Sequence, residues 1–210
     1  PFSDPAADGP VIQRADERAL AQGVDIFKVF ELVRKIRNNV EVPMVFLLYY
    51  NVMVQYGIEK FFKRCQETGV DGLIIPDLPY EESDEIKEYT EKYGVYQISL
   101  VSPTSKDRIK NIAKDAKGFL YCISSLGVTG EKSSFVTNFD EFVGTIKKYT
   151  DVPACVGFGV SNGRQVKELT KYFDGAIVGS AIVKSIATGE SVEERINNLR
   201  EKIKDLNHYI

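Results

Sequence analysis

Ala154-Cys155-Val156-Gly157-Phe158 is a five-residue apolar run that leads through a short turn, Gly159-Val160-Ser161, into a predicted helix. The run shows no polar alternation, which is typical of a strand buried on both faces of a sheet. Asn162 is a good helix N-cap, so the helix is expected over residues 164–172. This strand–turn–helix unit decides the fold, because it recurs along the chain.

The same alternation appears in five further places. Besides 154–158, the apolar runs expected to be strands are 43–50, 72–75, 96–101, 119–124 and 176–179. The helices expected around them are 25–37, 57–68, 81–92, 106–116 with Thr104 as its cap, one opened by Asn138 or Asp140, and 192–206. Apolar strands that alternate with helices predict an α/β fold, with a parallel sheet covered by helices.

Two architectures fit such a sheet: an open, doubly wound sheet and a closed eight-stranded barrel. No Gly-x-Gly-x-x-Gly motif opens a helix, so a dinucleotide-binding fold has little support. A barrel typically needs about 250 residues and one βαβ unit about 30 or more. The chain has 210 residues. We therefore expect a TIM (β/α)8 barrel with about six of its eight βα units present, as a single domain over residues 1–210.

The chain opens on Pro1-Phe2-Ser3-Asp4-Pro5-Ala6-Ala7-Asp8-Gly9-Pro10, which has the composition of a loop. A loop this constrained normally connects two regular elements. We therefore expect the sequence to begin partway through a domain, without the first strand, first helix and second strand of the barrel.

Composition and charge exclude several classes of protein. A net charge of -3 argues against a nucleic-acid surface, and no apolar run approaches the roughly 18 residues of a membrane span. Three cysteines at spacings unlike any metal motif suggest a reduced, cytoplasmic protein. The only histidine is His208, so hydrolase triads and histidine-ligated zinc sites lack a base or ligand. Acid–base chemistry must therefore fall to Asp, Glu, Tyr or Lys, and no metal is expected.

Glycines followed by hydroxyl residues mark the ends of the last three predicted strands, at 124–130, 157–161 and 179–181. Glycine lets a ligand approach the backbone, and the first N–H groups of the next helix carry a partial positive charge. Three such loops together favour phosphate binding. The alternative is that the glycines only make tight turns. Earlier loops carry carboxylates and phenols instead: Asp4, Asp8, Tyr49 and Asp77.

In these segments the chain resembles the tryptophan synthase alpha subunit family. Residues 1–13 closely resemble its second-strand loop, and 125–130, 157–161 and 179–183 match its later loops in order. The family is an eight-stranded barrel that cleaves indole-3-glycerol phosphate to indole and glyceraldehyde 3-phosphate, without metal or organic cofactor. Its partner in an α2β2 complex, the beta subunit, condenses the indole with serine.

The resemblance implies roles for the residues around the indole ring. Asp8 matches the catalytic aspartate, which handles the proton of the indole N–H. Leu47, Tyr49 and Tyr121 match positions that line the indole pocket; a plain core role remains open for both tyrosines. For Asp8 the alternative from the residues alone is a helix N-cap or a brace of the loop.

Other positions match the phosphate site and the partner surface. Thr129 and Gly130 match a mobile loop that closes over the substrate. The family's phosphate-binding site matches Phe158, Gly159, Gly179 and Ser180. Asp4 and the corner at Pro76 and Asp77 match surfaces that face the beta subunit.

One departure affects the function. The family's other catalytic group, a glutamate about four residues before the position of Pro1, is absent from this sequence. Asp77 is flanked by prolines, which suggest a rigid corner with an interface or structural role rather than a replacement base. Two alternatives remain open: a catalytically incomplete fragment that only binds a phosphate ligand or the beta subunit, and another phosphate-binding barrel, such as an isomerase of an amino-acid pathway.

Overall fold

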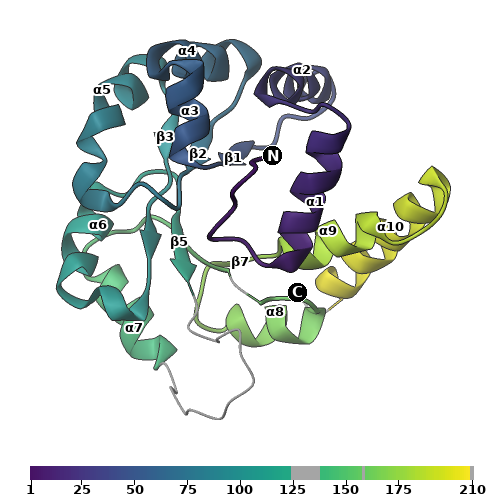
Figure 1. The fold of residues 1–210 in the computed structure, drawn as a ribbon. Coiled ribbons are helices and arrows are strands. Elements are labelled where there is room, and N and C mark those ends of the chain that lie inside the picture. The colour runs from purple at the N-terminus through teal and green to yellow at the C-terminus, as the bar shows by residue number, and fades with distance from the viewer. Residues whose placement is uncertain (124–137, 158, 209–210) are drawn as a thin grey trace. The chain divides into compact units, whose positions relative to one another are not determined.

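The computed structural model describes residues 1–123, 138–157 and 159–208 (Figure 1). Contacts divide the chain into two compact units, unit 1 (Pro1–Ser99) and unit 2 (Leu100–Ile210). Unit 1 holds a parallel sheet in the order β1-β2-β3, and unit 2 holds a parallel sheet in the order β4-β5-β6-β7. Among the described residues, no helix has both the length and the apolar composition that crossing a membrane requires.

Unit 1 packs its helices on its short sheet. Its elements are α1 (Pro10–Ala21), α2 (Ile26–Arg37), β1 (Val45–Leu47), α3 (Tyr50–Tyr56), α4 (Ile58–Thr68), β2 (Gly72–Ile74), the 3-10 turn η1 (Tyr80–Glu82), α5 (Asp84–Tyr93) and β3 (Tyr96–Gln97). Leu47 lies opposite Ile74 in the register of β1 and β2. The core lies between β2 and helices α2 to α5 (Figure 1), and its fully buried side chains include Phe30, Met53, Phe61, Phe62, Leu73 and Ile86.

Unit 2 repeats the strand–helix alternation. Its elements are β4 (Leu100–Val101), the 3-10 segment η2 (Pro103–Arg108), α6 (Ile109–Asp115), β5 (Leu120–Ile123), α7 (Phe139–Lys147), β6 (Ala154–Gly157), α8 (Gly163–Leu169), β7 (Gly175–Ile177), α9 (Ser180–Ala187) and α10 (Val192–Asn207). Helices α7, α8 and α10 begin at side-chain N-caps, which are Asn138, Asn162 and Ser191. Each cap satisfies a backbone N–H in the first turn of its helix.

Most predicted elements are present, with shorter strands than expected. The predictions of helices at 25–37, 57–68 and 192–206 and of caps at Asn138 and Asn162 are confirmed. The strand predicted at 43–50 extends too far. α3 begins at Tyr50, whose N–H donates to the carboxylate of Asp77. The run 96–101 forms two short strands, β3 and β4. The single domain over 1–210 stays a prediction.

The helix predicted at 106–116 also starts later than expected. Residues 103–108 form the 3-10 segment η2, and α6 begins only at Ile109. Thr104 is not its cap: the hydroxyl of Thr104 pairs with that of Ser102 at 2.8 Å.

In both sheets an aspartate at the amino end of a strand binds the neighbouring strand and fixes the strand register; we call this set of contacts the aspartate brace. In unit 1, the N–H of Met44 donates to the carboxylate of Asp71 at 2.7 Å, and the N–H of Asp71 donates back to the carbonyl of Met44 at 2.8 Å. Arg37 forms an ion pair with the carboxylate of Asp71. In unit 2, Ala154 and Asp174 make the same reciprocal contacts at 2.7 and 2.9 Å, and Lys147 supplies the cation. Each brace joins two neighbouring strands to the end of the helix that precedes the first of them, α2 in unit 1 and α7 in unit 2.

Gly157 is a glycine because the ring of Tyr121 occupies the space of its side chain. A Cβ at Gly157 would lie 2.3 Å from the phenol oxygen of Tyr121 and 2.5 Å from its Cζ. Tyr121 is in β5 and Gly157 ends the neighbouring strand β6. The glycine therefore sets the position of a phenol at this end of the sheet.

We predict that Asp174→Asn destabilises the protein and removes part of the acid dependence of its stability. Hydrogen bonds from Lys147 and from the N–H of Ala154 hold the pKa of Asp174 below its ordinary 3.8. The unfolded chain therefore binds more protons near that pH. The stabilising contribution is complete above about pH 4 and is lost as the pH falls through the folded pKa. Because the pair with Lys147 is partly exposed, we expect a loss of about 0.5–1 kcal/mol near neutral pH.

Urea unfolding near neutral pH and near pH 3 measures this effect. Glu168→Gln is the control, since Glu168 pairs with Lys171 at the surface. Equal losses at the two pH values for Asp174→Asn would contradict the assignment of the acid dependence to this carboxylate.

We predict that Gly157→Ala costs about 1–3 kcal/mol of unfolding free energy, the usual price of overpacking. Gly179→Ala is the matched control, because a Cβ at Gly179 meets no described atom within 4 Å. In a Tyr121→Ala background the cost of Gly157→Ala should shrink, since the clashing ring is gone. An equal cost in both backgrounds would show that Tyr121 is not the cause.

Candidate active site

The opening loop of unit 1 turns twice and presents Asp8 just before α1. The N–H of Ala6 donates to the carbonyl of Asp4 at 2.8 Å, and the N–H of Asp8 donates to the carbonyl of Pro5 at 3.1 Å. Gly9, not Asp8, is the N-cap of α1, so the alternative of Asp8 as a helix cap is wrong. The carboxylate of Asp8 is directed elsewhere, toward Tyr49.

Asp8 and Tyr49 form a hydrogen-bonded pair. The phenol of Tyr49 donates to Oδ2 of Asp8 at 2.8 Å and accepts the N–H of Ala7 at 2.9 Å. The ring of Phe2 stacks on Tyr49 with centroids 5.0 Å apart. These contacts fix both the phenol and the loop, so the carboxylate is held in one orientation.

A cavity of about 150 Å³ in unit 1 brings together the predicted catalytic residue and the two indole-pocket residues predicted in that unit. Asp8, Leu47 and Tyr49 all line it; Leu47 is 53% exposed and Tyr49 8% exposed. The rest of its wall is mostly apolar and consists of Pro1, Phe2, Ile12, Asp16, Ile26, Val29, Phe46, Leu48 and Val52. An apolar cavity with one oriented carboxylate suits a flat aromatic ligand that donates an N–H.

A raised pKa keeps the phenol of Tyr49 a hydrogen-bond donor. Burial, followed by the hydrogen bond to Asp8, raises the pKa of Tyr49 to about 12. The phenol therefore keeps its proton at neutral pH and remains available to donate to Asp8. Among the described residues, the hydrogen bond to the Asp8 carboxylate comes from Tyr49 at Oδ2, so Oδ1 can accept an N–H from a ligand.

Sequence reasoning missed Asp16, which lines the same cavity from α1. Burial, and to a smaller extent the charge of Asp8, raise the pKa of Asp16 above its ordinary value. The residue lies four positions after Ile12, on the same face of the helix. A carboxylate within an apolar helical stripe was the signal that could have found it.

Asp77 braces the chain beside this cavity. Its two carboxylate oxygens accept the N–H of Tyr50 at 2.9 and 3.1 Å, and the phenol of Tyr50 donates to Glu85 at 2.6 Å. Burial and the bond to Glu85 raise the pKa of Tyr50 to about 12. Asp77 thus fixes the backbone directly after Tyr49. Pro76 is half-buried and Asp77 exposed, and their contact with a partner stays a prediction.

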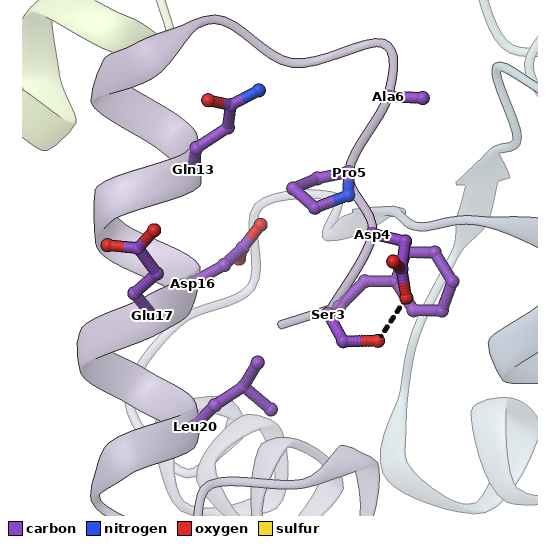
Figure 2. Close-up of a pocket in the computed structure, with 9 residues that line it drawn as sticks. Ser3, Asp4, Pro5, Ala6, Gln13, Asp16, Glu17 and Leu20 are labelled. Carbon is purple, nitrogen blue, oxygen red and sulfur yellow. Dashed lines mark hydrogen bonds between the residues drawn. The ribbon is translucent and has the colours of Figure 1, made fainter.

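A larger hollow of about 450 Å³ lies between the opening loop and α1. Figure 2 shows Asp4 on the loop, where it accepts the hydroxyl of Ser3 at 2.5 Å, and Asp16 and Glu17 on the helix. Three carboxylates line this hollow, so it is unsuited to a phosphate. Asp4 is exposed, as its predicted partner role requires, and that role stays a prediction.

In unit 2, the loops that carry Gly159 and Gly179 leave neighbouring strands. Gly157 pairs with Ile177 in the register of β6 and β7, so Gly159 and Gly179 follow the same end of two neighbouring strands. Gly159 has φ +75°, a left-handed conformation that favours glycine. Gly179 and Ser180 are both exposed.

Helix α9 presents an uncapped N-terminus at this edge. Gly179 is its N-cap, and in the described part of the chain no side chain caps the first turn. The first turn, Ser180-Ala181-Ile182, carries no acid. Helices α7, α8 and α10 differ, because side chains of their own cap them. The N-terminus of α9 is therefore suited to an anion.

Tyr121 is the remaining described site residue. It is half-buried in β5, and burial raises its pKa. Its contact with Gly157 ties it to the strand that leads to Gly159. Thr129, Gly130 and Phe158 lie outside the described residues.

Comparisons with known proteins agree over nearly the whole chain. The family model described as tryptophan synthase alpha chain matches residues 1–210. The tryptophan synthase alpha chain of Alkaliphilus metalliredigens is 48% identical over 206 residues, covering 97% of this chain and 77% of that protein. Solved structures are similar as well. The alpha subunit from Campylobacter jejuni has a TM-score of 0.86 at 41% identity, covering 98% of this chain and 80% of that one.

A chain of tryptophan synthase from M. tuberculosis in its aminoacrylate-bound form has a TM-score of 0.84 at 32% identity, covering 98% of this chain and 77% of that one. These similarities establish the α/β fold as that of a TIM barrel. The chain belongs to the tryptophan synthase alpha chain family, a family of lyases in tryptophan biosynthesis.

Proposed function

We propose that the chain is the alpha subunit that cleaves indole-3-glycerol phosphate to indole and glyceraldehyde 3-phosphate. One observation carries the proposal: Asp8 is held by Tyr49 in a largely apolar cavity that also contains Leu47. Family membership supplies the reaction, and this pair supplies a group suited to the indole nitrogen. Asp8, Leu47 and Tyr49 are the residues proposed to surround the ring.

Asp8 acts on the nitrogen in both halves of the reaction. As a proton adds to C3 of the indole, Asp8 takes the N–H proton and the ring becomes an indolenine. The bond between C3 and the side chain then breaks as the hydroxyl loses its proton and becomes the aldehyde. The electrons of that bond enter the ring, and Asp8 returns its proton to the nitrogen. Family resemblance assigns the protons at C3 and at the hydroxyl to a glutamate that precedes the position of Pro1.

Tyr49 is proposed to keep Asp8 ready for this exchange. Its phenol stays protonated because its pKa is raised to about 12, so it donates to Oδ2 throughout. A hydrogen bond to the charged form favours the carboxylate. Positioned acid–base groups of this kind typically contribute about 10²–10⁴-fold to a rate.

The phosphate of the substrate is proposed to bind the loops of unit 2. Gly159, Gly179 and Ser180 lie where β6 and β7 end, and the uncapped start of α9 offers backbone N–H groups. Tyr121 is proposed to contact the substrate as well, and Phe158, Thr129 and Gly130 are assigned to the same site by family resemblance alone. A favourable charge–dipole contact at a helix start is worth about 0.3–1 kcal/mol.

The beta subunit of tryptophan synthase is the proposed partner, in an α2β2 complex. Asp4 and Asp77 are exposed, and Pro76 is half-buried. Asp77 accepts the N–H of Tyr50, so the corner proposed to face the partner is bonded to the residue that follows Tyr49. A partner that moved Asp77 would therefore act on the backbone that carries the Asp8–Tyr49 pair.

We predict that Asp8→Asn lowers the rate of indole-3-glycerol phosphate cleavage by about 10²-fold or more, because an amide cannot accept the indole proton. Asp4→Asn, an exposed acid of the same loop, is the control and should leave the rate within twofold. Released indole can be followed by its fluorescence, because the chain contains no Trp. Binding of glycerol 3-phosphate should persist in both variants, and cleavage by Asp8→Asn within tenfold of wild type would refute the role.

We predict that Gly179→Asp weakens binding of glycerol 3-phosphate at least tenfold. A Cβ there meets open space in the described structure, so the effect comes from charge repulsion at the start of α9. Gly179→Asn adds a side chain of the same shape without the charge and should lose far less. Calorimetric titration measures the affinities. Equal affinity of Gly179→Asp and wild type would exclude a phosphate at this helix start.

A further inference from the structure

Lys202 of α10 reaches the loop that leaves β6. Its Nζ donates to the carbonyl of Ser161 at 3.2 Å and lies 3.3 Å from Oδ2 of Asp205. Its side chain is only 28% exposed. Lys204, two residues along the same helix, instead pairs with Glu201 at the surface and is 72% exposed. Helix α10 therefore directs one ammonium group to a backbone carbonyl and another to solvent.

A side chain also binds the N–H and the hydroxyl of Ser161. Its N–H and its hydroxyl both donate to Oε1 of Gln165, at 2.8 and 3.0 Å. Asn162 caps α8 by accepting the N–H of Gln165 at 3.0 Å. Both the N–H and the carbonyl of Ser161 are thus fixed by side chains, one from α8 and one from α10. Lys202 is the contact that comes from outside the loop and its own helix.

This anchored peptide lies two residues after Gly159. Gly159 is exposed with φ +75°, and the next residue, Val160, is buried. Because Val160 is packed and Ser161 is held, the peptide groups of Gly159 and Val160 have little freedom to rotate. Amide N–H groups that bind an anion must be aimed before it arrives, since ordering them on binding costs affinity.

We propose that Lys202 is a positioning residue of the phosphate-binding loop. Through the carbonyl of Ser161 it fixes the orientation in which Gly159 and Val160 present their amides to the substrate phosphate. The inference rests on the proposed function, because it takes the ligand of this loop to be that phosphate. The role is positional rather than a matter of net charge, since Asp205 lies close enough to offset the ammonium group.

The ion pair between Lys202 and Asp205 does not explain why the ammonium group of Lys202 is directed to the carbonyl of Ser161. Partly exposed ion pairs three residues apart on a helix are worth little, about 0–1 kcal/mol. A hydrogen bond from a charged donor to a carbonyl is stronger than one between neutral groups. The bond to Ser161 is also the contact that spans 41 residues of sequence, so it restrains the loop in a way that the local pair cannot.

Lys202→Met tests the proposal in the purified protein, with glycerol 3-phosphate as the probe. We expect its Kd to rise at least fivefold, while the thermal unfolding midpoint changes by no more than that of Lys204→Met. Lys202→Arg keeps a charged donor and should bring the Kd back to within twofold of wild type. Lys204→Met removes an ammonium group from the same helix without touching the loop, and its Kd should stay within twofold.

Two outcomes would overturn the inference. One is a Lys202→Met Kd within twofold of wild type, whether or not the unfolding midpoint falls, because that is what a purely structural lysine would give. The other is a Lys202→Arg variant as weak as Lys202→Met. Gly179→Asp separates this failure from that of the proposed function. If wild type binds glycerol 3-phosphate and Gly179→Asp does not, the phosphate site stands and only the role of Lys202 falls.

Discussion

The register of neighbouring parallel strands is the constraint on which the candidate site depends. Loops that leave adjacent strands meet only if the strands are aligned, and a shift by one residue would turn every side chain to the other face. In both units an aspartate at the amino end holds that register: Asp71 for β1 and β2, and Asp174 for β6 and β7. Leu47 and Tyr49 lie at the opposite end of β1, and Gly159, Gly179 and Ser180 follow the opposite ends of β6 and β7. A salt-bridged carboxylate at one end of each sheet therefore aligns the candidate site residues at the other end.

The consequences differ between the two sheets. In unit 1, the pairing of Leu47 with Ile74 brings the residues after β1 next to those after β2, so the carboxylate of Asp77 can accept the N–H of Tyr50. This bond ends the extended chain and starts α3 immediately after Tyr49. In unit 2, the pairing of Gly157 with Ile177 brings two glycine loops to one edge. The loop after β1 thus offers an oriented phenol, and the loops after β6 and β7 offer backbone amides.

Much of this arrangement was predictable from the sequence. The apolar runs and helix caps indicated the alternating fold, and the acidic and glycine-containing loops indicated where polar groups collect. The hydrogen bond between Asp8 and Tyr49 was not predictable, because it joins residues 41 positions apart and depends on two turns within the opening loop. Helix α3 was missed for a related reason. Its start is set by a carboxylate 27 residues later, and the apolar run gives no sign of that contact.

Three carboxylates near the cavity of unit 1 differ in what they contact, and that difference separates their roles. Asp77 accepts a backbone N–H at a helix start, which is a structural contact that any substitution by a non-acceptor would break. Asp16 lies on an apolar helical stripe, and burial raises its pKa, so its charged form is disfavoured. Asp8 accepts the hydrogen bond of the Tyr49 phenol, and the pKa of that phenol is raised to about 12, so Tyr49 remains the donor. Of the three, Asp8 is the one that lines the cavity and accepts a described hydrogen bond from a phenol, which is the geometry that the proposed contact with an indole N–H requires.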